Sequence, residues 1–203
     1  MDHLTAPRVE WGVAARAFED GVSGDAHLVQ ALPAGTLFGV VDGIGHGPAA
    51  AQAAREAIRL LAADPEHPVR AVGQCHERLK TTRGVVLMLA WLESPGDCLW
   101  WIGVGNAQGV LLSGDPEKRA RQQTLIGRVG VVGRQLPPLR ATQVPIASGD
   151  VLVLTTDGIR TSFTHTVSRQ DTPQDVADDI LERHWTRSDD GLVLVVRYQG
   201  ATP

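Results

Sequence analysis

The stretch VVDGIGHG at residues 40–47 is the most informative part of this sequence. Two valines lead into an acid, Asp42, and three of the next five residues are glycine. Pro48 and a run of alanines follow, and proline is favoured at the first position of a helix. The stretch therefore predicts a buried strand, a tight glycine turn and a helix, with a carboxylate where the strand ends.

Three more acids border apolar segments in a similar way. They are Asp25 in VSGDAHLV, Asp157 in LVLTTDGI and Asp189 in RSDDGLVLVV. A carboxylate at a buried strand end is partly desolvated, which is costly unless a cation or hydrogen bonds compensate. Several carboxylates in one cleft repel one another unless divalent ions neutralise them. Because oxygen-only ligands favour Mg²⁺ or Mn²⁺ over Zn²⁺, the four acids together indicate a hard-metal site.

Each acid taken alone has a simpler interpretation. Asp-Gly is a common turn pair, and Asp after a strand often caps a helix or turn. The metal hypothesis depends on four such acids in one chain and on a fold that brings them together. In such a site, two ions about 3.5–4 Å apart bind a phosphate between them and activate water. Gly43 would permit the tight turn and leave its carbonyl free to join the metal shell.

Length, composition and charge limit the class of protein. The chain has 203 residues, 43% of them hydrophobic and 21% charged, which is typical of one globular domain. The net charge is −4, and no Lys/Arg block is prominent. We therefore expect the protein to bind neither nucleic acid nor an anionic membrane surface. No apolar run reaches about 18 residues, and the first residues lack a signal-peptide layout. A cytoplasmic protein is the simplest expectation.

The pattern of apolar segments predicts an α+β fold. Strands are expected at 8–18, 26–31, 36–42, 84–92, 98–105, 107–112, 123–132, 139–146, 151–156 and 192–198, and helices at 48–63, 69–82 and 174–186. Strands and helices do not alternate, which argues against a doubly wound parallel sheet. Strands that are apolar on both faces must be covered on both, so we expect two packed sheets with helices outside.

The ordered motifs resemble those of a known enzyme family. SGD, VVDGIGHGPAAA, GDVLVLTTDGI and SDDGLVLVVR are similar to the metal-dependent type 2C serine/threonine protein phosphatases. The resemblance is to the bacterial SpoIIE/RsbU/RsbX-like branch, most of all to RsbX, and spans nearly the whole chain. It implies a four-layer αββα sandwich of two mostly antiparallel sheets, forming a single phosphatase domain over residues 1–203.

The resemblance also implies a mechanism and a partner. Asp42 would bridge two Mn²⁺ or Mg²⁺ ions, Gly43 would contribute its carbonyl, and Asp25, Asp157 and Asp189 would complete the metal shells. Metal-activated water would attack phosphoserine or phosphothreonine directly, without a phosphoenzyme. The substrates of this branch are STAS-domain regulators, either stressosome components or anti-anti-sigma factors, which implies a role in stress response and sigma-factor regulation.

Two residues near these motifs have open roles. His46 lies four residues after Asp42, whereas in many type 2C enzymes a histidine lies two residues after the corresponding acid. It is either a general acid or an exposed loop residue. Arg16 resembles a phosphate-binding arginine of the eukaryotic members, and its alternative is a solvated strand end.

Two further acids are alternates for the ligand set. Asp20, in RAFED, is a rival to Asp25, and Asp190 is held in reserve behind Asp189. The closing motif of the family usually continues DD-x-Thr, but Leu192 occupies the Thr place here. That change removes a hydroxyl near the site without removing an acid.

The leading hypothesis is a metal-dependent protein phosphatase that is expected to be a monomer. One alternative is a catalytically weak or inactive phosphatase fold that docks a STAS-domain partner. The four retained acids argue against it, because a pure binding surface does not need desolvated carboxylates. Another two-metal hydrolase, acting on nucleotides or small phosphate esters, is a third possibility, but no nucleotide-binding glycine loop is present.

Overall fold

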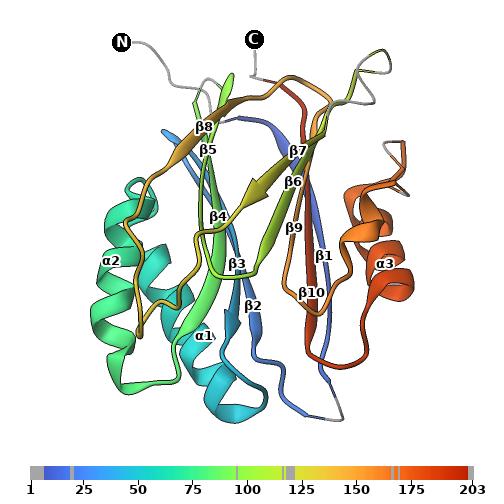
Figure 1. The fold of residues 1–203 in the computed structure, drawn as a ribbon. Helices are drawn as coiled ribbons and strands as arrows, with labels where there is room; N and C mark the ends of the chain where they lie inside the picture. The colour runs from blue at the N-terminus through green and yellow to red at the C-terminus, as the bar shows by residue number, and fades with distance from the viewer. Residues whose placement is uncertain are drawn as a thin grey trace.

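The structure is a computed structural model of the 203-residue chain. It describes residues 7–18, 21–94, 96–115, 117, 122–165, 167–168 and 170–200. These residues form ten strands in two antiparallel sheets, together with three α-helices (Figure 1). None of the helices among them is long and apolar enough to cross a membrane.

Each sheet has five strands. The first sheet has the order β1 (Val9–Arg16), β10 (Gly191–Tyr198), β9 (Val151–Thr155), β6 (Gln108–Leu112) and β7 (Gln122–Ile126). The second has the order β2 (Asp25–Leu32), β3 (Gly35–Gly43), β4 (Val85–Glu93), β5 (Cys98–Val104) and β8 (Thr142–Pro145). Because β1 pairs with β10, the first and the last of these strands are neighbours in the same sheet.

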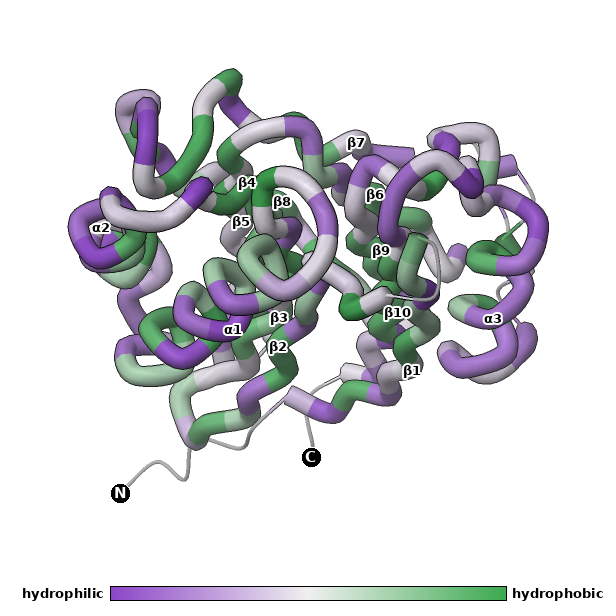
Figure 2. The backbone as a smooth tube through the Cα atoms, turned by 90° about the horizontal axis from the view of Figure 1, so that it is seen from below, coloured by the Kyte–Doolittle hydropathy of each residue, from purple (hydrophilic) through white to green (hydrophobic). Residues whose placement is uncertain are grey.

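Helices cover the outer face of each sheet. Helices α1 (Pro48–Ala62) and α2 (Pro68–Arg78) lie against the second sheet, and α3 (Pro173–His184) lies against the first (Figures 1 and 2). Two short 3₁₀ helices, Leu79–Thr81 and Thr161–His165, follow α2 and precede α3. The layer order is helix, sheet, sheet, helix, which confirms the predicted four-layer αββα sandwich.

The main core lies between the two sheets. Phe38 and Met88 of the second sheet pack with Leu154 and Leu194 of the first. Strand β4 is buried over Val85–Leu92, because one face meets the other sheet and the opposite face meets α1 and α2. This double burial explains the unbroken apolar run that the sequence shows at 84–92.

The predicted elements are confirmed, with two notable differences in length. The strand expected at 123–132 ends at Ile126, and residues 127–132 cross to the second sheet, where Val132 pairs with Val85. At Gly127 the chain leaves the ladder and passes very close to another loop. The approach leaves no room for a side chain, since a Cβ atom on Gly127 would lie 2.6 Å from the Gly105 oxygen. The next strand begins only at Thr142, beyond the pair Pro137-Pro138.

Candidate metal centre

Two of the predicted acids face each other across neighbouring strands. Asp25 is the first residue of β2, and Asp42 is the last but one of β3. The antiparallel register places these two residues directly opposite one another. Directly opposed residues have Cβ atoms about 4.5–5.5 Å apart, so the two carboxylates share one small space.

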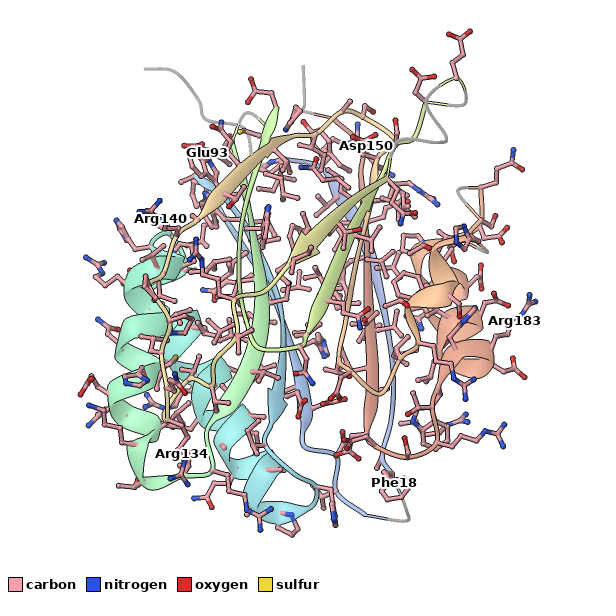
Figure 3. The ribbon with its side chains drawn as sticks, in the orientation of Figure 1. Phe18, Glu93, Arg134, Arg140, Asp150 and Arg183 are labelled. Atoms are coloured by element: carbon pink, nitrogen blue, oxygen red, sulfur yellow. The ribbon has the colours of Figure 1, made fainter. Side chains whose placement is uncertain are left out.

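The other two acids lie at the same end of the first sheet. Asp157 follows the end of β9, and Asp189 precedes the start of β10, which runs antiparallel to β9. A hydrogen bond connects the two sheets at this end of the molecule. The Thr156 hydroxyl, after β9, donates it to the Asp25 carboxylate of β2 at 2.7 Å. In Figure 3, Phe18 marks this end of the molecule, whereas Glu93 and Asp150 lie at the opposite end.

Burial and mutual repulsion make these carboxylates hard to ionise. Burial, followed by the charge of Asp25, raises the pKa of Asp42 to about 9. Burial also raises the pKa of Asp25 to about 7, against the opposing hydrogen bond from Thr156. The pKa of Asp157 is raised by burial and by Asp189, although a 2.6 Å hydrogen bond from the Asn106 amide opposes the shift. The site thus gathers negative charge that it does not itself neutralise.

The donor set suits a hard divalent cation. No basic side chain of the described residues forms an ion pair with these four acids. All the candidate donors are oxygen atoms, which Mg²⁺ and Mn²⁺ prefer. Within the described ranges, however, no three His, Cys, Asp or Glu side chains already form a cage around one point. The arrangement supplies the donor type and the uncompensated charge, while Asp25 and Asp157 are turned toward Thr156 and Asn106.

Gly43 is required by packing rather than by its backbone angles. A side chain at this position would overlap the carbonyl oxygen of Ala50, because the first turn of α1 lies directly against it. The left-handed residues of the turn are Gly45 and Gly47, with φ angles of 87° and 80°. The expectation that Gly43 permits the tight turn is therefore better assigned to these two glycines, and Gly43 instead permits close contact between β3 and α1.

The neighbouring acids Asp189 and Asp190 have different surroundings. Asp190 is 3% exposed, and its two carboxylate oxygens accept hydrogen bonds from the Phe18 and Gly24 backbone nitrogens, at 2.7 and 2.6 Å. It thereby fastens both ends of the segment that joins β1 to β2. Asp189 is half-buried, and among the described residues its side chain accepts only the Asp190 backbone N–H, so it is the freer ligand candidate. The other alternate, Asp20, lies outside the described residues.

His46 and Arg16 lie at the rim of the site. His46 is exposed in the glycine turn and stands edge-on to the Phe18 ring, with centroids 6.4 Å apart. Arg16 is exposed at the end of β1, and its guanidinium carbon lies 5.2 Å from the centre of the Trp185 ring. Neither forms an ion pair with the described acids, so a catalytic His46 and a phosphate-binding Arg16 stay predictions.

Two supporting residues, Asn106 and Thr156, were not identified from the sequence, and Asp190 was identified only as an alternate metal ligand. Asn106 donates a hydrogen bond to Asp157. Asp190 accepts hydrogen bonds from both ends of the β1–β2 segment. Thr156 accepts a 2.9 Å hydrogen bond from the Leu192 backbone nitrogen while its own hydroxyl donates to Asp25. A hydroxyl is thus present beside the Leu192 position after all, supplied by the neighbouring strand. The position of Thr156 directly before Asp157 is the sequence feature that could have identified it.

Comparison with known proteins gives a consistent result. The family model described as Stage II sporulation protein E (SpoIIE) matches residues 33–199. No curated protein sequence matches the chain. A chain from a structure of the bacterial stressosome, described as a modular system adapted to control secondary messenger signaling, superposes with a TM-score of 0.85 and 29% identity, over 94% of this chain and 100% of that one.

Two further solved structures share the fold at lower identity. RsbX in complex with magnesium gives a TM-score of 0.82 and 16% identity, over 94% of this chain and 96% of that chain. The PP2C phosphatase domain and regulatory fragment of SpoIIE from Bacillus subtilis gives 0.78 and 22%, over 97% of this chain and 65% of that one. At these identities the likeness concerns the fold.

Proposed function

The chain belongs to the SpoIIE family, within the PP2C-like branch that includes RsbU and RsbX, and from this premise we propose that it is a metal-dependent protein phosphatase. Its substrate in this proposal is a protein carrying phosphoserine or phosphothreonine. The proposed phosphatase domain spans residues 1–203, and we expect it to act as a cytoplasmic monomer.

The observation that carries the proposal is the pair of half-buried acids on neighbouring strands. Asp25 and Asp42 are opposed in register, and burial raises their pKa values to about 7 and 9. Keeping two such carboxylates together without a basic partner costs folding free energy. Such an arrangement is reasonable where divalent cations bind. No comparable need exists in a surface that only docks a partner.

The proposed ligand set uses residues from both sheets. Asp42 and the Gly43 carbonyl would hold Mn²⁺ or Mg²⁺ ions. Asp25, Asp157 and Asp189 complete the set. When bound, such ions neutralise phosphate charge and lower the pKa of water. Thr156 and Asn106 orient two of these carboxylates through the hydrogen bonds described above.

The reaction is hydrolysis of a phosphate monoester. Water attacks phosphorus, the bond from phosphorus to the serine or threonine oxygen breaks, and that oxygen takes up a proton. His46, exposed in the turn after Asp42, is the candidate proton donor. Arg16, exposed at the end of β1, is a candidate contact for the phosphate oxygens.

We propose a STAS-domain regulator as the phosphoprotein. This choice is supported by the likeness to a stressosome chain at 29% identity and by the RsbX-like fold. The proposal places the protein in stress signalling, where removal of a phosphate would reset the regulator.

A direct assay separates the candidate functions. p-Nitrophenyl phosphate and a phosphorylated STAS-domain protein are each incubated with the protein, with and without Mn²⁺, alongside Asp42→Asn. We expect Mn²⁺-dependent hydrolysis of both substrates and loss of at least about 100-fold in the variant. Hydrolysis at the same rate without Mn²⁺, or full activity of Asp42→Asn, would contradict the mechanism. Binding of the STAS protein without any hydrolysis would instead favour a docking module.

A further inference from the structure

A row of arginines borders the acid site on the side of the second sheet. Sequence and structure both set this region apart. Between Glu117 and Asp150 the chain contains six basic residues and no acid, although the net charge of the whole protein is −4. The described part of this segment runs from β7 across α2 to β8 (Figure 1). It carries Arg128, Arg134 and Arg140, which are all exposed.

Backbone hydrogen bonds hold Arg128 beside the acid site. Its N–H donates to the Gly103 carbonyl at 3.0 Å, and its own carbonyl accepts from Gly105 at 2.8 Å. The next residue after Gly105 is Asn106, which donates to Asp157. Val129, which follows Arg128, is 95% exposed, so the backbone presents an apolar side chain and a cation together to solvent.

A second contact point involves Arg83, at the start of β4. The Ile44 backbone nitrogen donates to the adjacent Gly84 carbonyl at 3.1 Å, which ties this strand to the glycine turn. The Arg83 guanidinium lies over Gly45, since a side chain added there would come within 2.7 Å of Nη1. Arg134 in turn donates from Nε to the Arg83 carbonyl at 3.3 Å.

These arginines have no acidic partners among the described residues. No ion pair joins Arg83, Arg128 or Arg134 to an acid there, whereas Arg59, Arg70 and Arg183 on the helices are all paired. In Figure 3, Arg134 lies toward the end of the molecule where Phe18 marks the acid site, and Arg140 lies farther up the same side. Arg83, Arg128 and Arg134 thus place positive charge near the acid site, with no acidic partner among the described residues.

We propose that Arg83, Arg128, Val129 and Arg134, here called the arginine rim, form the docking surface for an acidic segment that flanks the phosphorylated residue of the protein substrate. This inference rests on the proposed function and adds a substrate preference to it. Arginine is suited to attracting carboxylates because its guanidinium group is always positively charged. The exposed Val129 favours a protein partner, because nucleic-acid backbones offer little apolar surface.

The test uses two pairs of synthetic peptides. One pair has Asp and Glu on both sides of a central serine, and the other has Lys at the same positions. Each is made with and without phosphate on the serine. Fluorescence anisotropy measures binding of the unphosphorylated forms, which requires no turnover. Hydrolysis of the phosphorylated forms and of p-nitrophenyl phosphate is measured with Mn²⁺.

We expect the acidic peptide to bind more tightly than the Lys peptide, and more weakly as salt rises. The double variant Arg128→Glu/Arg134→Glu should weaken its binding by at least about fivefold. The kcat/KM for its phosphorylated form should fall by a similar factor, while that for p-nitrophenyl phosphate stays within about twofold. The matched control Arg140→Glu, from the same basic segment, should leave all three quantities unchanged.

A conservative variant separates charge from structure. Arg134→Lys keeps the charge but not the planar fork that reaches the Arg83 carbonyl, and it should bind the acidic peptide within about twofold of the unaltered protein. An equal loss in Arg134→Lys, or in Arg140→Glu, would overturn the proposal. So would equal binding of both peptides, or tighter binding of a single-stranded oligonucleotide than of the acidic peptide. If no substrate is hydrolysed, the proposed function fails, while the binding measurements still decide the docking surface.

Discussion

At the scale of single residues, neighbouring acids at one sheet end have separate tasks. Asp42 is a half-buried acid without a basic partner among the described residues, and its pKa is raised to about 9. Asp190 is more deeply buried but uses both oxygens to bind backbone N–H groups. Removing these two side chains should therefore have opposite effects on stability.

Asp42→Asn should abolish metal-dependent activity without destabilising the metal-free protein. Near neutral pH the Asp42 carboxyl of the metal-free protein is protonated, so an amide of the same shape replaces a neutral group. We expect Tm in EDTA to be unchanged or higher, and the Tm increase caused by Mn²⁺ to be lost. Thermal unfolding with and without Mn²⁺ measures both, and a large drop in Tm in EDTA would contradict this account.

Asp190→Ala and Asp189→Ala should separate the roles of the adjacent acids. Asp190→Ala leaves the Phe18 and Gly24 N–H groups without their acceptor, which costs about 1–3 kcal/mol for each group that is not rehydrated. Asp189→Ala removes one acceptor of the Asp190 N–H and should cost about 1 kcal/mol or less. Urea unfolding gives the stabilities. Activity at saturating Mn²⁺ should fall strongly in Asp189→Ala, and a stable but inactive Asp190→Ala would reverse our assignment.

At the scale of secondary-structure elements, the close contact between β3 and α1 shapes the site. The glycine turn places α1 against the end of β3. The helix lies so close that there is no room for a side chain on Gly43. The helix begins at Pro48 with Gly47 as its N-cap residue. Its alanines, among them Ala50 and Ala54, keep the helix close to the sheet. The position of Asp42 thus depends on how α1 packs.

Gly43→Ala should weaken both the fold and metal binding. The added methyl group overlaps the Ala50 carbonyl, so α1 must move away from the sheet, at a cost of roughly 1–3 kcal/mol. The control is Gly73→Ala in the interior of α2, where nothing lies within 4 Å of the new methyl group. That change should stabilise the protein by roughly 0.5–1 kcal/mol. Urea unfolding of both variants tests the contrast, and equal stability would contradict it.

The elements themselves were well predicted by local patterns. The apolar run at 84–92 and the alanine-rich segment after Pro48 became β4 and α1 close to their expected bounds. Within residues 127–141 the predicted strand ends, 127–132 and 139–141, were wrong, because the path depends on distant contacts such as that between Gly127 and the Gly105 oxygen. The same contacts place Arg128, so the arginine rim could not be anticipated either.

At the scale of the whole molecule, the sandwich brings together acids that are far apart in sequence. Each motif could be recognised from its own stretch of sequence. Predicting that the four acids lie close together would have required the strand order of both sheets. The difference between Asp189 and Asp190 was also beyond the sequence, because it depends on Phe18 and Gly24, more than 160 residues away. Such long-range hydrogen bonds leave no periodic signal in the chain.

The stability of the metal-free protein should fall as pH rises. Asp25 and Asp42 have pKa values of about 7 and 9 when folded, above the ordinary value of 3.8. The folded state therefore binds protons more tightly than the unfolded chain. The resulting stabilisation is complete below about pH 4 and is lost as pH rises through 7 and 9. Tm in EDTA should decline across this window, and less steeply in Asp42→Asn.

Divalent metal should reverse this decline, because it binds the ionised carboxylates. At about 100 times its Kd a bound ion adds about 2.7 kcal/mol, a rise of several degrees in Tm for a protein of this size. We expect the increase to be larger at pH 8.5 than at pH 5.5. A Tm increase from Mn²⁺ that is independent of pH would show that other groups bind the ion.

The hydrogen bond from Thr156 to Asp25 crosses from one sheet to the other. Each sheet supplies two of the four acids in the proposed ligand set, so neither sheet alone contains the complete site. A small sliding of the two sheets would separate the ligand pairs before it disturbed either hydrogen-bonded ladder. The chemistry of the site would then report the alignment of the two halves of the sandwich. Any partner that shifts one half could set the rate without touching the acids.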